Sequence, residues 1–232
     1  MRHRLQILLG LFILVLTGCQ AASVESPAFG EVRLAGAEES GYWVEADLTP
    51  VKTSAYSQSL RDGLAEEWQI YREASLEERR LGHIWGSCRF TAKSWTEAVE
   101  FLGITPENPM ETCDWLEQSG AVTVHYAGTE DGTVTSADVW TLYVDGTCRV
   151  QLIVRFSGEA NYTTGCTQGR TETVSMENGN TALLVTPQST DRYCSVDAYF
   201  VQNGALYFLH VVDEPENVRA ARDTMEKLLS AF

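Results

Sequence analysis

The side chains best suited to covalent chemistry in this sequence are its cysteines and histidines. Besides Cys19 near the start, the chain carries five cysteines: Cys88, Cys113, Cys148, Cys166 and Cys194. A cysteine nucleophile needs a histidine base within hydrogen-bond reach. His83 falls in a predicted turn, whereas His125 and His210 fall within predicted strands. We therefore expect these histidines to have structural roles, and we expect the protein not to be an enzyme.

Motifs for metal binding and for hydrolysis are missing from the sequence. There is no Cys-x-x-Cys or His-x-x-x-His spacing, so we expect neither a metal nor a cofactor. There is also no Gly-x-Ser-x-Gly elbow and no Gly-rich phosphate loop. The acidic pairs Glu130-Asp131 and Glu38-Glu39 fall in predicted turns or tethers, where solvated charge explains them. A glycan hydrolase needs two carboxylates at a fixed distance in a cleft, which a sequence alone does not reveal.

The six tryptophans are a large aromatic load for a chain of this length. They are Trp43, Trp68, Trp85, Trp95, Trp115 and Trp140. An indole ring can stack on the apolar face of a sugar, but it fills a core more often. Most of the six fall on predicted apolar faces or beside helix starts, where we expect core packing. Trp85, Trp115 and Trp140 lie outside the clearest helical stripes, and they are the candidates for binding a ligand.

The first nineteen residues have the form of an export signal. Met1-Arg2-His3-Arg4 is basic, and the apolar run Leu5–Leu16 that follows is too short to span a bilayer comfortably. Leu16-Thr17-Gly18-Cys19 resembles the bacterial lipobox, whose cysteine receives a diacylglyceryl group before signal peptidase II cleaves. The resemblance implies that residues 1–18 are removed and that Cys19 is lipidated. We therefore expect an extracytoplasmic protein that its acyl chains anchor to the cell membrane.

The protein is strongly acidic. Its formal net charge is -15, and removal of residues 1–18 would take away two of the 17 basic residues and none of the 32 acidic ones, leaving -17. This charge repels the phosphates of nucleic acids and anionic lipid headgroups. We expect no nucleic-acid partner, and we expect contact with the membrane through the diacylglyceryl anchor rather than a basic patch.

Disulfide bonds between the five cysteines beyond Cys19 are one of two alternatives. An extracytoplasmic location permits disulfides. The pairs that the predicted elements could bring together are Cys148 with Cys166, Cys166 with Cys194, and Cys88 with Cys113. Because five is an odd number, at least one thiol would stay unpaired in a monomer. The other alternative is that all thiols stay reduced and pack as small apolar groups.

The domain organisation follows from composition and periodicity. Residues 19–40 are rich in Ala, Glu, Ser and Gly, which is typical of a flexible tether behind the anchor. Residues 41–232 are long enough for a single α+β domain, with a helical part over 41–118 and a sheet with a terminal helix over 119–232.

Helical spacing and capping signals predict the helices. Apolar residues recur every three or four positions over residues 54–74, which predicts an amphipathic helix. The capping boxes Ser75–Glu78 and Ser94–Glu97 predict two shorter helices, of which the second ends at Gly103. A final amphipathic helix follows Pro215, and we expect it to pack on one face of the sheet.

Beyond Gly120 the periodicity changes to two, with turn dipeptides at short intervals. Asp131-Gly132, Asp145-Gly146, Asn178-Gly179 and Asn203-Gly204 are typical of tight hairpin turns. The pattern predicts an antiparallel meander of about seven strands. These strands are Val122–Tyr126, Val134–Val144, Cys148–Phe156, Thr171–Glu177, Thr181–Thr186, Tyr193–Gln202 and Ala205–Val212.

Three segments carry a family resemblance: the helix Ser94–Gly103, the hairpin around Gly204-Ala205-Leu206-Tyr207 and the terminal helix Ala220–Leu229. Together they resemble uncharacterised extracytoplasmic lipoprotein domains of Firmicutes, which are similar to the C-terminal domains of anti-sigma-associated membrane proteins. The resemblance covers Arg89–Phe232 and departs from the family in a long insertion between the two sets of hairpins. It implies a similar final strand and helix, and it supplies no catalytic residue.

Three functions follow from these observations, in order of preference. The first is a non-enzymatic cell-surface lipoprotein that interacts with an envelope protein or senses the envelope, because the lipobox is present and catalytic spacing is missing. The alternative is a carbohydrate-binding surface receptor, which the aromatic load and the acidic charge favour. The third is a cell-wall or glycan hydrolase. A two-lobed solute-binding protein is disfavoured, because the predicted strands do not alternate with helices.

Overall fold

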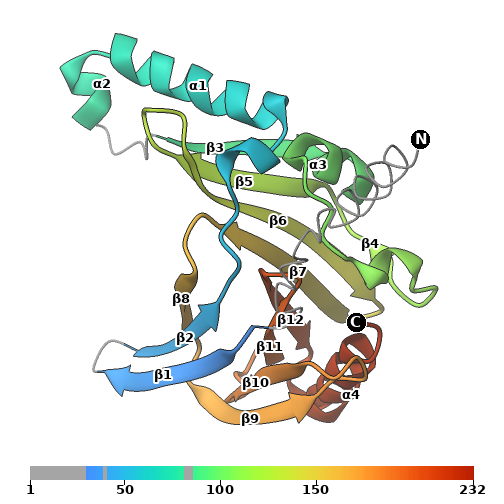
Figure 1. Ribbon diagram of the computed structural model, residues 1–232. Coiled ribbons are helices and arrows are strands. Elements are labelled where there is room, and N and C mark those ends of the chain that lie inside the picture. Colours follow the sequence, from blue (N-terminus) through green and yellow to red (C-terminus); the bar gives the residue numbers. More distant parts are fainter. Residues whose placement is uncertain (1–29, 39–40, 81–85) are drawn as a thin grey trace, which may run out of the picture.

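Twelve β-strands and four α-helices form the part of the chain that the structure describes, residues 30–38, 41–80 and 86–232 of a computed structural model (Figure 1). The strands make two sheets, and each strand pair within this part is antiparallel. The predicted α+β fold with a largely antiparallel sheet is therefore confirmed.

The larger sheet has nine strands in the order β3-β5-β6-β7-β12-β11-β10-β9, with the short β4 beside β6. All seven strands predicted from the period-two pattern are present in it, and Gly132, Gly146, Gly179 and Gly204 have the positive φ that their tight turns require. The strands are β3 (Ser87–Ala92), β4 (Glu117–Gln118), β5 (Val122–Gly128), β6 (Val134–Asp145), β7 (Cys148–Ser157), β9 (Gly169–Ser175), β10 (Thr181–Pro187), β11 (Cys194–Gln202) and β12 (Ala205–Asp213).

The strand order joins two meanders rather than continuing one. Strands β5, β6 and β7 form the first up-and-down run, and β9 to β12 form the second. After β7 the chain leaves the large sheet and forms a strand of the other sheet. It then returns to the large sheet as β9, which is the edge strand at the end opposite β3. Strands β10, β11 and β12 follow in order from this edge toward the middle of the sheet. The last of them, β12, pairs with β7, with Leu206 opposite Arg155 and Val212 opposite Arg149.

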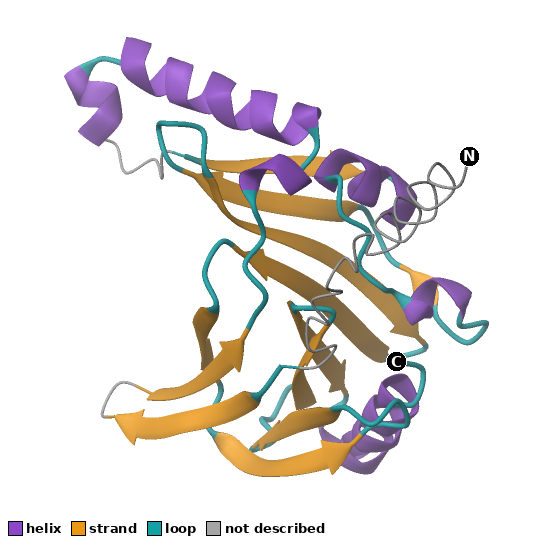
Figure 2. Cartoon of the chain, viewed as in Figure 1, coloured by secondary structure: helices purple, strands orange, loops and turns teal. Residues whose placement is uncertain are grey.

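Helices cover the outer face of the large sheet, and the sheet curves around the smaller one (Figure 2). Helices α1 (Gln58–Glu73) and α3 (Trp95–Leu102) contact β3 and β5, while α4 (Val218–Leu229) contacts β11 and β12. The side chains that point to this face, such as Val139, Leu152 and Leu209, are completely buried. The predicted packing of the terminal helix on one face of the sheet is confirmed.

Both predicted capping boxes are present. The Ser94 hydroxyl accepts a hydrogen bond from the Glu97 backbone N–H at 3.2 Å, and the Glu97 carboxylate accepts one from the Lys93 N–H at 2.7 Å. Gly103 ends α3 at φ 83°. Ser75 starts the short α2 (Leu76–Arg80) in the same way. The caps satisfy N–H groups that no helical carbonyl can reach.

Removal of the α3 cap gives a first prediction. We expect Ser94→Ala to lower the free energy of unfolding by about 1 kcal/mol and Ser94→Gly by only a few tenths, since glycine leaves the end of the helix open to water. Urea denaturation of both variants measures the difference. Equal losses in the two variants would contradict a capping role for the hydroxyl.

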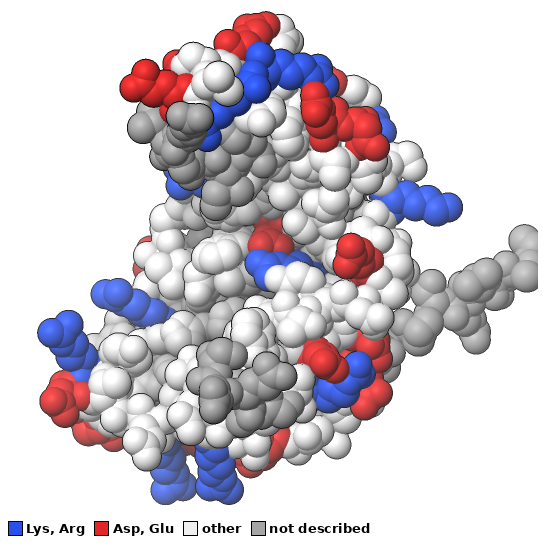
Figure 3. All heavy atoms as spheres, turned by 90° about the vertical axis from the view of Figure 1, so that its left-hand side faces the viewer, with Lys and Arg blue, Asp and Glu red and all other residues white. Residues whose placement is uncertain are grey.

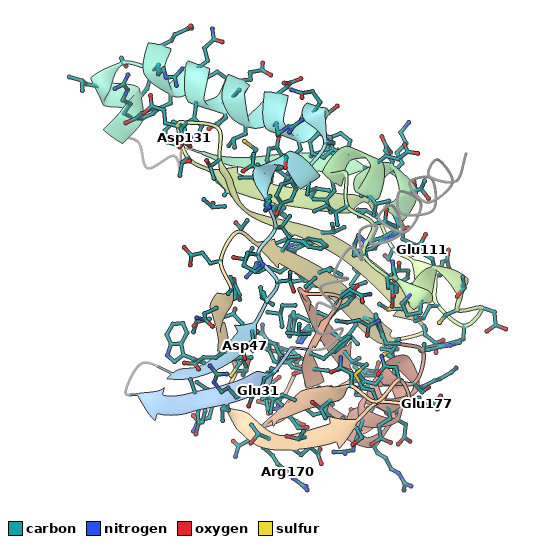
Figure 4. The ribbon with its side chains drawn as sticks, in the orientation of Figure 1. Glu31, Asp47, Glu111, Asp131, Arg170 and Glu177 are labelled. Carbon is teal, nitrogen blue, oxygen red and sulfur yellow. The ribbon has the colours of Figure 1, made fainter. Side chains whose placement is uncertain are left out.

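The smaller sheet has the order β1-β2-β8, with β1 (Val32–Glu38), β2 (Gly41–Asp47) and β8 (Asn161–Cys166). It packs on the inner face of the large sheet, over β10, β11 and β12. Side chains of both sheets form a second core: Val44, Ala46, Leu48, Leu183, Val185, Tyr199, Val201 and Leu206. On the outer side of this sheet, Arg33 pairs with Glu45 at 2.8 Å, and Glu31 and Asp47 lie at the same end of β1 and β2 (Figure 4).

Two predicted boundaries are wrong. Val32–Glu38 was expected in a tether, but it is a strand whose Val32 and Leu34 pack on the second core. The alternation of apolar and polar residues in this strand is short and is followed by Ala, Gly and Glu, so the segment has the composition of a tether. The predicted helical part, residues 41–118, also contains strands β2, β3 and β4, which pair with partners far along the chain. Residues 1–29, including the predicted export signal and Cys19, lie outside the described residues.

Candidate functional site

The inner face of the large sheet carries three rows of side chains that run across the strands. Residues paired directly across antiparallel strands point to the same side of a sheet, so the strand registers define the rows. An aromatic and apolar row lies between two polar rows. Row one contains His125, Asp138, Arg155 and Leu206, row two contains Trp140, Ile153, Phe208 and Tyr199, and row three contains Gln151, His210 and Asp197.

The charged pair of row one is Arg155 with Asp138. The guanidinium Nε donates to Asp138 Oδ1 at 2.5 Å, and Nη2 donates to Oδ2, so the contact is bidentate. The two side chains are 23% and 12% exposed, which makes this the most shielded arginine–carboxylate pair of the described residues. The guanidinium also lies over the Tyr162 ring of β8, at 4.9 Å from its centroid. Arg155 is thereby held where β7 of the large sheet meets β8 of the smaller one. Its Nη1 atom takes no part in the hydrogen bonds to Asp138.

Row three holds a second pair, His210 with Asp197. The imidazole Nδ1 lies 2.5 Å from Asp197 Oδ1, and the Asp197 side chain is only 4% exposed. A carboxylate accepts from an N–H, so this contact places the ring proton on Nδ1 and leaves Nε2 open to other partners. The imidazole also stacks on Phe208, with the ring centroids 6.0 Å apart.

The aromatic row is braced by neighbouring rings. Phe208 stacks on Tyr199 at a centroid distance of 4.8 Å, and Trp140 packs against His125 at 5.1 Å. Burial lowers the pKa of His125, and the charges of Arg89 and Arg155 lower it further against the opposing effect of Asp138. The contacts between rings fix the orientations of the aromatic side chains in row two.

Strand β8 lies over these rows and encloses two adjoining pockets. A pocket of about 200 Å³ is lined by Trp140, Ile153, Arg155, Thr164, Gly165, Tyr199, Leu206 and Phe208. A more open pocket of about 330 Å³ is lined by Gln151, Gly165, Cys166, Thr167, Asp197, Tyr199, Phe208 and His210. We call the first the aromatic pocket, the second the polar pocket, and the two together the groove. Gly165, Tyr199 and Phe208 line both pockets.

The space-filling view shows the side of the molecule on which β8 and the smaller sheet lie (Figure 3). Acidic and basic atoms lie side by side at its waist, within a largely uncharged surface. This distribution agrees with a groove whose charges are paired with one another. Such a surface favours ligands that offer apolar faces and hydrogen-bonding groups over ligands with a strong net charge.

The groove places a thiol near a histidine, but the arrangement does not activate the thiol. Cys166 lines the polar pocket with His210 and Asp197. Burial raises the pKa of Cys166, and the carboxylate of Asp197 raises it further. A catalytic cysteine needs the opposite shift, which a nearby cation produces. His83 lies outside the described residues, and the expectation that no cysteine–histidine pair acts as a nucleophile stays a prediction.

The predicted ligand-binding tryptophans do not meet in one site. Trp140 lines the aromatic pocket. Trp115 lies on the other side of the sheet, where its ring packs on the main core and against Lys227 of α4, with Nζ 3.7 Å from the ring centroid. Trp85 lies outside the described residues. Of the three candidates, Trp140 thus belongs to the groove, whereas Trp115 has a structural role in its contact with α4.

All five described cysteines are free thiols: Cys88, Cys113, Cys148, Cys166 and Cys194. The pair Cys148 and Cys166 considered above is split between the two sheets, because Cys148 belongs to β7 and Cys166 to β8. Cys148 and Cys194 are buried, and Cys194 donates from Sγ to the Glu214 carbonyl at 3.0 Å. The two buried thiols pack as small apolar groups, as the second alternative describes, whereas the other three are half-buried, and the choice between the alternatives stays a prediction.

The buried thiols predict a loss of stability at alkaline pH. Burial raises the pKa of Cys148 from 9.0 to about 11. The unfolded chain therefore ionises this thiol first as the pH rises, so the free energy of unfolding should fall from pH 9 upward. Urea denaturation at pH 8 and pH 10 measures the fall. Cys148→Ala should show a smaller fall than the wild type, and an identical fall in both would refute this source.

Most residues of the groove were not predicted from the sequence. Asp197 lies in β11, a strand whose residues are all buried, and a charged residue in such a strand is a usable signal for a buried polar contact. Asp138 and Arg155 lie in strands that carry other polar residues, so they give no comparable signal. The sequence predicts a structural role for His210. In the structure its imidazole contacts the Asp197 carboxylate and lines the polar pocket. Each pair lies within one hairpin, Asp138–Arg155 across β6 and β7 and Asp197–His210 across β11 and β12. The pairing of β7 with β12, which no local pattern indicates, brings the two hairpins onto one surface.

Two further properties concern metals and membranes. The described residues contain no group of three or more His, Cys, Asp or Glu side chains arranged to hold a metal ion. Among those same residues, no helix has both the length and the apolar character needed to cross a bilayer.

Comparison with protein-family models, with curated proteins and with solved structures finds no match for the chain. The resemblance to extracytoplasmic lipoprotein domains therefore stays a prediction, and functional inference rests on the groove itself.

Proposed function

We propose that this protein is a non-enzymatic, lipid-anchored binding module of the bacterial envelope, and that its groove binds a neutral saccharide. The observation that carries the proposal is the aromatic row between two hydrogen-bonding rows. The apolar C–H face of a pyranose stacks on an aromatic ring such as Trp140, while its hydroxyls need donors and acceptors at the ring edge. Arg155 lies on one side of that row, and Gln151 and His210 lie on the other.

The charge balance of the groove favours a neutral ligand. Arg155 is neutralised by Asp138, and the Asp197 carboxylate is engaged by His210. The rest of the protein is strongly acidic, with a formal charge of -15 for the full sequence. A polyanionic glycan would meet repulsion during its approach, and Arg155, the arginine of the three rows, is already neutralised by Asp138.

The same pairing disfavours hydrolysis. A glycosidase needs one carboxyl group as an acid and another as a base or nucleophile, both facing the glycosidic bond. Asp138 and Asp197 are the carboxylates of the three rows, and each is held by a basic partner on the sheet. A binding role therefore fits the groove better than the third hypothesis, a glycan hydrolase.

A glycan array probed with the full chain in detergent tests the proposed ligand class. We expect selective binding to neutral glycans, and we expect the bound glycan to titrate with a measurable affinity in calorimetry. A blank array, or one on which only acidic glycans bind, would contradict the proposal.

The location proposed for the protein has its own test. Replacing Cys19 by Ala removes the thiol that the lipobox resemblance marks for a thioether bond to diacylglycerol. We expect the wild-type protein to fractionate with bacterial membranes and Cys19→Ala to fail to acquire lipid, as mass spectrometry of the intact chain would detect. An unmodified Cys19 in the native protein would refute the anchor and leave the binding proposal standing.

A further inference from the structure

We infer that the groove holds two adjoining sugar rings, so that its ligand is at least a disaccharide. This inference rests on the proposed function and adds to it the size of the ligand and the position of each ring. The aromatic pocket would hold one ring and the polar pocket the next. Three observations carry it: the spacing of the pockets, their different linings and their shared wall.

The two pockets are related by one repeat of the strands. On β7, Ile153 lines the aromatic pocket, and Gln151, two residues away, lines the polar one. On β12, Leu206 and Phe208 line the aromatic pocket, and Phe208 and His210 line the polar one, which is again a step of two residues. Two residues of an antiparallel strand span about 6.8 Å. This step suits one pyranose ring together with its glycosidic linkage.

Strand β8 repeats the same step from the opposite side of the groove. Thr164 lines the aromatic pocket, and Cys166 lines the polar pocket. These positions are half-buried, whereas Thr163 and Gly165, on either side of Thr164, are exposed, so both Thr164 and Cys166 point toward the large sheet. The ligand would therefore run parallel to β8, with one ring under each of these side chains.

The linings assign a different task to each ring position. The aromatic pocket brings Trp140, Ile153 and Leu206 together and suits the apolar face of a ring. The polar pocket offers the Gln151 amide and the free Nε2 of His210, which suit hydroxyl groups. At about 330 Å³ against about 200 Å³, the polar pocket is also the roomier of the two.

Phe208 and Tyr199 form a shared wall rather than a partition. Both rings line the two pockets, and they stack on each other at 4.8 Å. Gly165 lines both pockets from the β8 side, and a methyl group added there would approach the Trp43 ring at 3.9 Å, on the outer side of the sheet. The backbone of β8 therefore passes over the junction without a side chain that would close it.

The experiment compares a monosaccharide with the disaccharide built from it, using the best neutral glycan from the array as the guide to the sugar. Calorimetry with the full chain in detergent should give at least tenfold tighter binding of the disaccharide. Gln151→Ala should remove most of that gain while leaving the affinity for the monosaccharide unchanged. Gln69→Ala, on the exposed side of α1, is the matched control and should change neither affinity.

The possible results separate the inference from the proposed function. Equal affinities for the two sugars, or an equal loss of both in Gln151→Ala, would overturn the two-ring inference and leave saccharide binding intact. If neither sugar binds to the wild-type chain, both the inference and the proposed function fail. A circular dichroism melt of Gln151→Ala that matches the wild type shows that any loss arises in the groove.

Discussion

Replacing Asp138 by alanine is expected to lower the free energy of unfolding by about 3 kcal/mol, because it leaves the shielded charge of Arg155 without its partner. The Arg155 side chain is 23% exposed and is also held by the Tyr162 ring, so it cannot turn fully into water without giving up that contact. Urea denaturation measures the change directly.

The exposed pair Arg72–Glu130 provides the matched control. Its side chains are 55% and 57% exposed at a distance of 2.8 Å, so Glu130→Ala should cost less than about 1 kcal/mol. The double variant Asp138→Leu with Arg155→Met should recover much of the stability lost in Asp138→Ala, since an apolar pair needs no partner charge. A loss in Asp138→Ala no larger than that in Glu130→Ala would show that the shielded pair contributes no more to stability than an exposed one.

Replacing Trp140 by alanine is expected to weaken saccharide binding by tenfold or more. The indole is the largest ring system among the side chains that line the aromatic pocket, and a loss of about 1.4 kcal/mol in binding free energy corresponds to a factor of ten. Trp140→Phe should lie between the wild type and the alanine variant, because the smaller ring keeps part of the stacking surface. Calorimetric titration with the best neutral glycan from the array provides the measurement.

Trp115→Ala is the control for the tryptophan series. Trp115 was an equal candidate on sequence grounds, but its ring packs against Lys227 on the opposite side of the sheet. We expect this variant to keep the wild-type affinity, even where the loss of packing lowers its stability. Equal weakening in Trp115→Ala and Trp140→Ala would mean that binding depends on general stability and not on the groove.

The sequence indicates the elements of this fold far better than it indicates their partners. The tight turns at Gly132 and Gly204 and the capping box at Ser94 are local signals, and each appears where expected. The pairing of β7 with β12 and the packing of β8 over the large sheet join distant segments. Nothing local encodes them, since many orders of the same strands satisfy the same alternation.

The candidate site was harder to predict, because it forms only where β8 of the smaller sheet meets the large sheet. Trp140 was singled out by its position outside the helical stripes, and it does line the aromatic pocket. The hairpin registers place Arg155 beside Asp138 and His210 beside Asp197, but only the pairing of β7 with β12 brings the two pairs onto one surface. A groove made by two sheets therefore stays hidden until the sheets are placed against each other.

The most direct test of saccharide binding is an NMR titration that observes the indole N–H signals of the ¹⁵N-labelled protein, with assignments made from single-tryptophan variants. As the neutral glycan is added, the Trp140 signal should move progressively and saturate, while the Trp115 signal stays in place. A Trp140 signal that does not respond at glycan concentrations that saturate binding in calorimetry would place the ligand elsewhere and contradict the account of the groove.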